Sequence, residues 1–411
     1  MDTNNIDNDD DDDHQQVQQE QQAAAAAAAA VADQRHSKIM SVLKRKKKFT
    51  LRHRKQIDEL VETFLEALEQ DIYDMLCDND FDNYHGLDSD RDTEEEVETT
   101  LRCFPELLSR RNDDYFHYPI HSLPYLYDVT NENIRCNLKA VSFIPLVARL
   151  SIEFGCFNEV FRGGLLFEIG RAGCMPLCDL MLTDTLGRQR EHHETVDNKY
   201  LIVMKQLRHM GLLKKEDIQN FGLLRKYKYP QGEIDGTVFP EERFRFLAEW
   251  DPIALTQTYI SDSRCNIPLH QAALGSSMEG FQLVFETGIR YFPKKKGISL
   301  LFQKNIEDET PETPFATACS NYGLNDVIKV VEKCLSDSSD KPNSFSEAFL
   351  SAAVNEDIHL DCVYFLLRRD PDMLQKLLPA SLTTSSVKHS KRKRKRNNIN
   401  DKGDDGKTCK T

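Results

Sequence analysis

The stretch Ile267-Pro268-Leu269-His270-Gln271-Ala272-Ala273 carries the clearest structural signal in the sequence. Proline is favoured at the first position of a helix, because the N–H group that it lacks has no partner inside the helix there. The stretch is followed by Gly280 and by an apolar stripe at Phe281, Val284 and Phe285. Steps of three and four residues place such a stripe on one side of a helix. The segment therefore predicts two consecutive helices that pack against each other.

The same pattern returns at Thr313-Pro314-Phe315-Ala316-Thr317-Ala318-Cys319, followed by Gly323 and an apolar stripe over 324–331. Weaker copies begin at Tyr118-Pro119-Ile120-His121 and Met175-Pro176-Leu177, and a half-match lies at Ala352-Ala353. The residues that define the pattern are Pro268, Leu269, His270, Ala272, Gly280, Thr313, Pro314, Ala318 and Gly323. We interpret them as structural, the histidine included, because a lone histidine without a charged partner is a poor candidate for catalysis.

These segments resemble the ankyrin repeat, whose signature Thr-Pro-Leu-His-x-Ala opens a pair of helices. The first segment differs from the signature only in Ile267, and the second keeps Thr313, Pro314 and Ala318. The resemblance implies an all-α fold, an ankyrin-like helical repeat array that forms an irregular solenoid over 97–378. It also implies partner binding through hairpin tips and the concave face of the first helices. In its overall sequence pattern the chain is similar to the divergent ankyrin-type proteins found in large algal families.

The spacing of the two clear copies is irregular. Pro268 and Pro314 are 46 residues apart, against about 33 for a regular ankyrin unit. The excess lies in 291–308, which we expect to be an inserted loop or an extra hairpin. A basic cluster lies at the tip of this segment and supplies candidate partner contacts: Arg290, Tyr291, Lys294, Lys295 and Lys296. The alternative is that these lysines only keep an exposed edge from pairing.

A second recurring phrase places a proline shortly before a leucine, at 104–108, 250–255 and 369–374. Each copy follows an apolar helical stripe, so the proline marks a helix end. Strand signals are scarce: we find no series of alternating segments and no Asn-Gly hairpin turn. The sequence thus favours a body built from stacked helix pairs.

An amphipathic helix is predicted from Ile57 to Leu76, where apolar residues recur at steps of three and four. Its glutamates lie mostly on the opposite face. We expect the apolar stripe to cover one end of the body, and a partner-binding role is the less favoured alternative. An acidic loop is expected over 78–96.

Charge is segregated along the 411 residues, whose 53 Lys and Arg and 67 Asp and Glu give a net charge of −14. Residues 1–36 form an acidic, Gln- and Ala-rich tail that we expect to be disordered, because few of its side chains could be buried. Residues 37–77 comprise a basic segment and the amphipathic helix. After the acidic loop over 78–96 and the repeat domain over 97–378, residues 379–411 form a basic tail that is also expected to be disordered.

Two basic runs stand out in this pattern, at 44–48 and 391–396. The second run consists of Lys391, Arg392, Lys393, Arg394, Lys395 and Arg396. Six adjacent like charges repel one another and cannot pack, so the run is a candidate nuclear-import signal, with a solvated run or a nucleic-acid contact as alternatives.

Metal and enzyme signatures are missing from the sequence. The 11 cysteines contain no Cys-x-x-Cys pair and are interpreted as small buried thiols. His192 and His193 are adjacent, so they cannot share a helix face, and we interpret them as surface polar residues. The sequence has no phosphate loop, nucleophile elbow or kinase motif. We therefore predict no catalytic residue, metal, cofactor or small-molecule substrate.

The leading functional hypothesis is a non-catalytic protein–protein interaction scaffold. An acidic body favours a protein partner with a basic patch, because complementary fields accelerate encounter. The alternative is a nuclear regulatory protein that contacts nucleic acid through the basic runs alone, since phosphate repels the acidic body. The N-terminus lacks a secretory pattern and no run is long enough to span a bilayer. An intracellular protein of the nucleus or the cytoplasm is expected, without a membrane partner.

Overall fold

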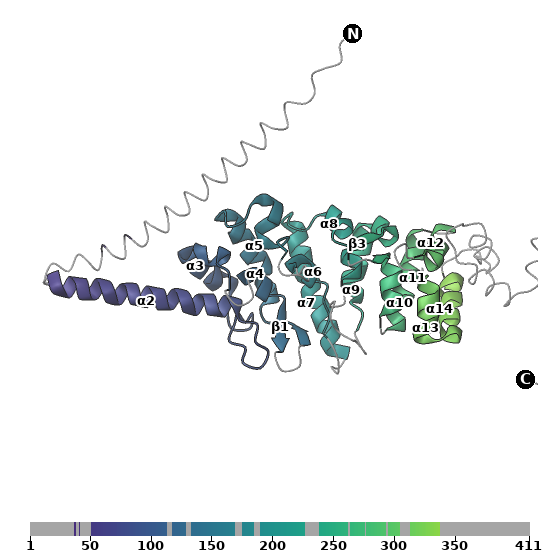
Figure 1. The fold of residues 1–411 in the computed structure, drawn as a ribbon, viewed down its shortest axis with the longest axis horizontal. Coiled ribbons are helices and arrows are strands. Elements are labelled where there is room, and N and C mark those ends of the chain that lie inside the picture. Colours follow the sequence, from purple (N-terminus) through teal and green to yellow (C-terminus); the bar gives the residue numbers. More distant parts are fainter. Residues whose placement is uncertain are drawn as a thin grey trace, which may run out of the picture. The chain divides into compact units, whose positions relative to one another are not determined.

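The computed structural model describes Ser37, Ser41 and residues 51–112, 117–128, 133–168, 175–184, 190–226, 238–261, 264–275, 277–292, 295–304 and 313–337. Within this part of the chain helices predominate, and the strands form two short hairpins (Figure 1). The all-α class is thereby confirmed for the described residues. The predicted tails at 1–36 and 379–411, both basic runs and the repeat features at 352–374 lie outside them.

The first half of the fold, up to α7, contains α2 (Leu51–Cys77), α3 (Glu94–Cys103), the 3₁₀ helix η1 (Pro105–Ser109), α4 (Pro119–Ser122), β1 (Tyr125–Asp128), β2 (Asn133–Cys136), η2 (Val141–Phe143), α5 (Ile144–Glu153), η3 (Glu159–Gly164), α6 (Pro176–Asp179) and α7 (Arg190–His209). The second half contains α8 (Lys215–Asn220), η4 (Leu223–Arg225), α9 (Glu241–Trp250), η5 (Pro252–Thr256), β3 (Tyr259–Ser261), β4 (Arg264–Asn266), α10 (Pro268–Leu274), α11 (Met278–Tyr291), α12 (Lys295–Ser299), η6 (Leu300–Phe302), α13 (Pro314–Tyr322) and α14 (Leu324–Asp337).

Helices α10 and α11, like α13 and α14, form the two helix pairs that the repeated pattern predicts. In both pairs an extended residue precedes the proline that begins the first helix, Ile267 in one and Thr313 in the other. The Thr313 hydroxyl accepts a hydrogen bond from the N–H of Ala316 at 3.2 Å, which satisfies a donor that has no partner inside the helix. Helix α10 packs on α13, and α11 packs on α14, so the pairs lie side by side (Figure 1).

The recurring proline phrase marks helix ends in both described copies. Helix α3 ends at Cys103, two residues before Pro105 begins η1, and α9 ends at Trp250, two residues before Pro252 begins η5. Two apolar residues after each proline are buried: Leu107 and Leu108 in η1, and Ala254 and Leu255 in η5.

The two hairpins were not expected from the sequence. Strands β1 and β2 are antiparallel, with Tyr125 opposite Cys136, and β3 and β4 are antiparallel, with Tyr259 opposite Asn266. Each strand has only three or four residues. Such short segments hold too few residues for an alternating pattern to show.

The insertion at 291–308 is helical in its described part, where we predicted a loop or a hairpin. Helix α12 and η6 turn back onto α11, and Leu300, Leu301 and Phe302 are buried. Gly297 makes this close approach possible, because a Cβ atom there would overlap the carbonyl oxygen of Phe292. The segment therefore adds to the core between the two helix pairs.

Helix α2 is longer than predicted and is buried only near its carboxyl end. Its buried residues all lie between Ile72 and Cys77, where it packs on α4. By contrast, Leu60 is 70% exposed and Phe64 is 65% exposed. The expected covering of one end of the body is therefore made by the last turns of α2, and the stripe before them is more exposed than predicted.

Candidate partner-binding groove

Helix α7 is the central element of the candidate site. Its inner face carries apolar side chains at helical spacing, and the buried ones include Val196, Tyr200, Met204 and Leu207. This face packs on η2, α5 and α9. The opposite face is turned away from the core and carries Ile202, Lys205, Gln206 and His209, all of which are exposed.

A buried ion pair fixes α7 to α9. Arg243 of α9 is fully buried, and its Nε donates to Oδ1 of Asp197 at 2.7 Å. The same carboxylate accepts the backbone N–H groups of Glu242 at 2.7 Å and Arg243 at 3.3 Å. It thereby caps the N-terminus of α9, where helical N–H groups lack internal partners and the helix dipole favours a negative charge.

The guanidinium of Arg243 also forms hydrogen bonds with the backbone of the segment that follows α6. Its Nη1 donates to the carbonyl oxygens of Leu180 at 2.6 Å and Leu182 at 2.9 Å. The guanidinium carbon lies 5.1 Å from the ring centre of Tyr200. One side chain thus joins α7, α9 and the segment 180–182.

A second buried contact corrects our interpretation of the two histidines. The His192 ring contacts the carboxylate of Asp184, which also accepts the N–H of Cys136 in β2. His193 is 7% exposed. His193 is therefore buried, and His192 is only partly exposed beside Asp184.

The buried carboxyl of Asp179 gives a pH-dependent prediction. Burial raises its pKa to about 7, although the charge of Lys226 opposes the shift. Its Oδ2 has no hydrogen-bond partner within the described part of the chain. Because the folded state holds this proton more tightly than the unfolded state, its contribution to stability is present below pH 4 and is lost as the pH rises through 7.

We therefore expect the Asp179→Asn variant to unfold at a higher urea concentration than the natural protein at pH 8. Its free energy of unfolding should be higher by a few kcal/mol, because each unit of pKa shift corresponds to about 1.4 kcal/mol. At pH 4 the two proteins should differ little. Urea midpoints measured between pH 4 and 8 test this. A difference between the two proteins that does not change with pH would contradict the assignment.

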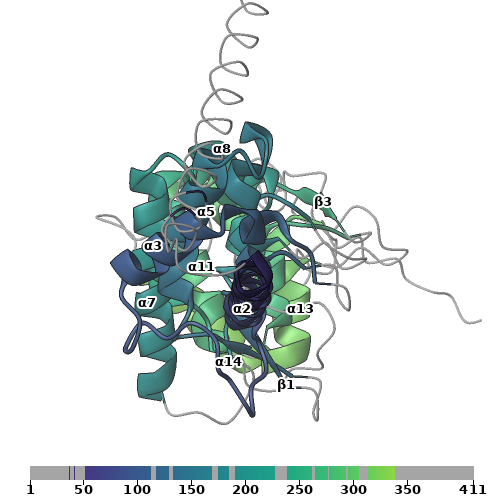
Figure 2. The same cartoon turned by 90° about the vertical axis from the view of Figure 1, so that its left-hand side faces the viewer.

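A groove of about 440 Å³ runs between α5 and the outer face of α7. In Figure 2, α3, α5 and α7 lie on the same side of the view, and α5 contacts both of the others. The groove is lined by Glu94, Pro145, Leu146, Arg149, Ile202, Lys205, Gln206, His209 and Met210. Ile202 is 56% exposed and Met210 is 37% exposed, so large apolar side chains are open to solvent here.

On the α7 side the groove is lined by one lysine, Lys205. Residues 198–215 contain five Lys or Arg and no acidic residue, in a chain whose net charge is −14. On the α5 side, Arg149 donates to Glu98 at 2.8 Å, so its charge is already paired. Lys205 therefore carries positive charge beside the apolar floor, and Glu94 also lines the groove.

A second hollow, of about 480 Å³, is acidic and lies beside the end of α2. Its lining includes Asp71, Asp74, Asp78 and Asp80. The last two carboxylates accept hydrogen bonds from backbone N–H groups of their own loop. Asp78 accepts the N–H of Asp80, and Asp80 accepts the N–H of Asp82, each at 2.9 Å. Among the described residues, no group of three or more His, Cys, Asp or Glu side chains is placed to hold a metal ion.

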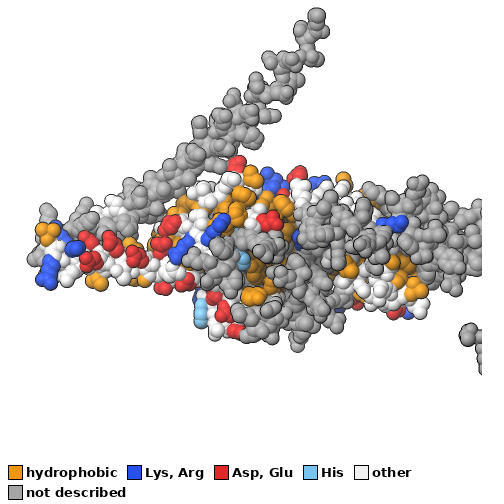
Figure 3. All heavy atoms as spheres, viewed as in Figure 1, with side chains coloured by type: hydrophobic (Ala, Val, Ile, Leu, Met, Phe, Trp, Pro, Cys, Tyr) orange, Lys and Arg blue, Asp and Glu red, His pale blue; other side chains and the backbone are white. Residues whose placement is uncertain are grey.

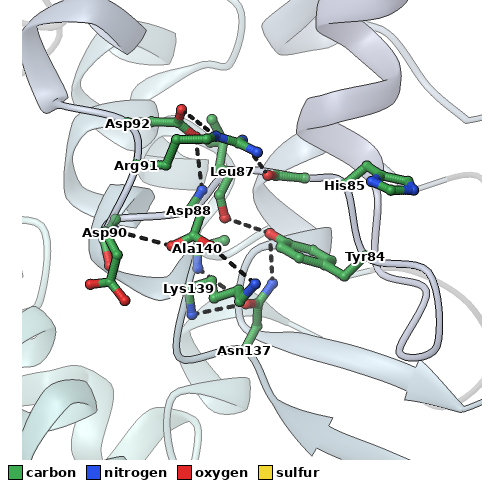
Figure 4. Close-up of polar contacts among 12 residues, drawn as sticks. Tyr84, His85, Leu87, Asp88, Asp90, Arg91, Asp92, Asn137, Lys139 and Ala140 are labelled. Atoms are coloured by element: carbon green, nitrogen blue, oxygen red, sulfur yellow. Dashed lines mark hydrogen bonds and ion pairs between the residues drawn. The ribbon is translucent and has the colours of Figure 1, made fainter.

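The rest of this loop is tied to the turn that follows β2, as Figure 4 shows. Asn137 donates to the Tyr84 hydroxyl at 3.2 Å, and that hydroxyl donates to the Leu87 carbonyl at 2.7 Å. Lys139 pairs with Asp88 at 3.0 Å. The backbone N–H of Asp90, which donates to this carboxylate, and the charge of Lys139 lower the pKa of Asp88. The predicted acidic loop ends at Thr93, which caps α3 from Glu94 onward.

The cysteines of the described part are free thiols, and burial makes several of them unreactive. Burial raises the pKa of Cys77 to about 12 and also raises that of Cys136. A thiol with a raised pKa carries little of the thiolate that acts as a nucleophile or metal ligand.

Two of the predicted partner contacts, Arg290 and Tyr291, are described with their side chains. Arg290 is exposed in the last turn of α11, and Tyr291 is half-buried beside it. Lys295 and Lys296 begin α12, while Lys294 and the side chains of Lys295 and Lys296 lie outside the described part. Neither Arg290 nor Tyr291 lines the groove or the acidic hollow.

The residues of the repeated pattern are packing residues. Buried among them are Pro268, Leu269, His270, Ala272, Gly280, Thr313, Pro314 and Ala318. The His270 ring accepts the N–H of Ile267 at 3.4 Å. A Cβ atom at Gly280 would lie 2.7 Å from the Phe239 ring, and Gly323 has a φ of 86° in the left-handed region.

Comparisons with protein-family models, curated proteins and solved structures find no match to this chain. None of the described helices combines the length and the apolar character needed to cross a bilayer.

Proposed function

We propose that this protein is a non-catalytic protein–protein interaction scaffold built on ankyrin-like helix pairs. The side-by-side packing of α10 and α11 against α13 and α14 supports this, together with the buried pattern residues. In a repeat array each unit packs on its neighbours, so binding surfaces are held in place before a partner arrives. Little freedom is then lost on association.

The observation that carries the proposal is the solvent-exposed apolar floor between α5 and α7. Exposed apolar patches bordered by polar residues mark interaction sites. Ile202 and Met210 supply the apolar surface, and Lys205 supplies positive charge beside it. The groove is suited to a segment of a partner protein that offers a large apolar side chain flanked by acidic groups. The partner with a basic patch, favoured by the net charge, would meet the acidic surface near α2 instead.

A selection experiment tests the groove with a defined probe. A display library of random 16-residue peptides is selected on the full chain, and the bound peptides are sequenced. We expect a large apolar residue flanked by Asp or Glu. The selected peptide should bind the Ile202→Glu variant at least about tenfold more weakly, which corresponds to about 1.4 kcal/mol.

Val160→Glu is the matched control, because Val160 is 73% exposed and lies outside the groove. It should leave the affinity unchanged. Peptides that bind Ile202→Glu as well as the natural protein would show that the groove is not the docking site.

A further inference from the structure

We propose that two copies of this chain associate through antiparallel pairing of their α2 helices. This interface lies apart from the groove and does not depend on the function proposed above. Helix α2 has an apolar stripe that its own chain leaves largely uncovered: Leu60 is 70% exposed and Phe64 is 65% exposed. Ile57, Val61 and Leu68 complete the stripe and are half-buried.

The order of the apolar residues fits a second copy running in the opposite direction. The stripe is symmetric about the point between Glu62 and Thr63. In an antiparallel pair centred there, Ile57 lies opposite Leu68 and Val61 lies opposite Phe64. A two-fold axis repeats both contacts, so the same patch on each copy forms a self-complementary interface. These residues also follow the alternating three- and four-residue steps of a coiled-coil seam.

The charges of α2 select the antiparallel direction. Its first five residues contain Arg52, Arg54 and Lys55 and no acid, whereas 56–77 contain seven acids and no base. Figure 3 shows blue side chains at the N-terminal end of α2 and red ones farther along the helix. A parallel pair would place the seven acids of one copy beside those of the other, which costs free energy. An antiparallel pair places the basic end of each helix beside the acidic end of its partner.

One ion pair makes this arrangement specific. The seam continues by one step at each end, to Arg54 and to Asp71, which are both exposed. In the antiparallel pair Arg54 of one copy lies level with Asp71 of the other. An arginine–aspartate contact thus lies at each end of the apolar contacts. Because both residues of this contact come from α2 itself, the partner that fits the seam is a second copy of this chain.

Sedimentation equilibrium of the full chain over a range of concentrations tests the proposal. We expect a concentration-dependent dimer, and Phe64→Glu should weaken it at least about 100-fold, because a charge would enter the seam. Circular dichroism checks that this exposed position leaves the fold intact. Ile253→Glu, at a 50% exposed residue of η5, is the control and should dimerise normally.

Exchanging the two charges of this ion pair distinguishes the proposed dimer interface from other contacts that could cover α2. Arg54→Asp and Asp71→Arg should each weaken the dimer about tenfold, and the double variant should restore it, because the opposite charges meet again. A chain that is monomeric at all concentrations would overturn the proposal and indicate that another segment of the same chain covers α2. A dimer that survives Phe64→Glu, or a double variant without recovery, would also overturn it.

Discussion

Replacing Arg243 by methionine should lower the free energy of unfolding by about 3–5 kcal/mol, the cost of breaking a buried ion pair from one side. Methionine fills similar space but offers no donors. The carboxylate of Asp197 would stay buried between α7 and α9 without its counter-charge. The carbonyl oxygens of Leu180 and Leu182 would also lose their partner. Urea unfolding followed by circular dichroism measures the change.

Two further variants distinguish this mechanism from a general loss of an arginine. Arg245→Met removes the i,i+4 surface pair with Glu241 on the same helix and should cost less than about 1 kcal/mol. Adding Asp197→Asn to Arg243→Met removes the stranded charge but keeps an acceptor for the N–H groups of α9, so it should regain stability. Equal losses for Arg243→Met and Arg245→Met would refute the importance of the buried pair.

Replacing Gly163 by alanine should lower the free energy of unfolding by about 3 kcal/mol, the sum of a left-handed backbone penalty and an overpacking penalty. Gly163 has a φ of 68°, and it follows Arg162, whose φ is 46°. A Cβ atom at Gly163 would overlap the carbonyl oxygen of Ala148 in α5. Because the obstacle is backbone, α5 and η3 would have to move apart.

Gly211→Ala provides the comparison for this variant. Gly211 has a similar φ of 73°, but a Cβ atom there would meet nothing within 4 Å. The Gly211→Ala substitution should therefore lower the free energy of unfolding only by the left-handed backbone penalty, about 1 kcal/mol. Thermal unfolding of both variants gives the difference, and equal losses would show that the close approach to α5 is unimportant.

The local signals of the sequence predicted local structure well. The proline-led stretches at 267–273 and 313–319 each begin a helix, because the position of the proline and of the preceding extended residue depends on a few neighbouring atoms. The same holds for the helix ends before Pro105 and Pro252. The repeat-array interpretation of the whole body stays a prediction, since it concerns how distant units stack.

Burial was harder to predict than helix formation. The stripe of α2 has the spacing of a core-facing helix, yet Leu60 and Phe64 are exposed, since periodicity says nothing about whether a partner surface is present. His192 looked like a surface residue because its partner, Asp184, lies eight residues away and is brought to it only by the fold. The apolar run at 300–302 was a usable signal for the buried η6 segment.

The groove could not be derived from the sequence because it depends on how α5 approaches α7. Pro145 and Ile202 lie far apart in the chain and meet only in the folded protein. The absence of acids from 198–215 was a visible hint, which the overall charge of −14 obscured. The predicted cluster at 290–296 was found by charge alone, without information on a neighbouring cavity.

Hydrogen exchange of the full chain, with and without the selected peptide, tests the central claim most directly. The claim is that the surface between α5 and α7 receives a partner segment on a frame that is already in place. We expect the peptide to slow exchange in 144–153 and 199–210 and to leave the other helices unchanged. Protection centred on 290–299, or protection spread over the whole fold, would contradict it.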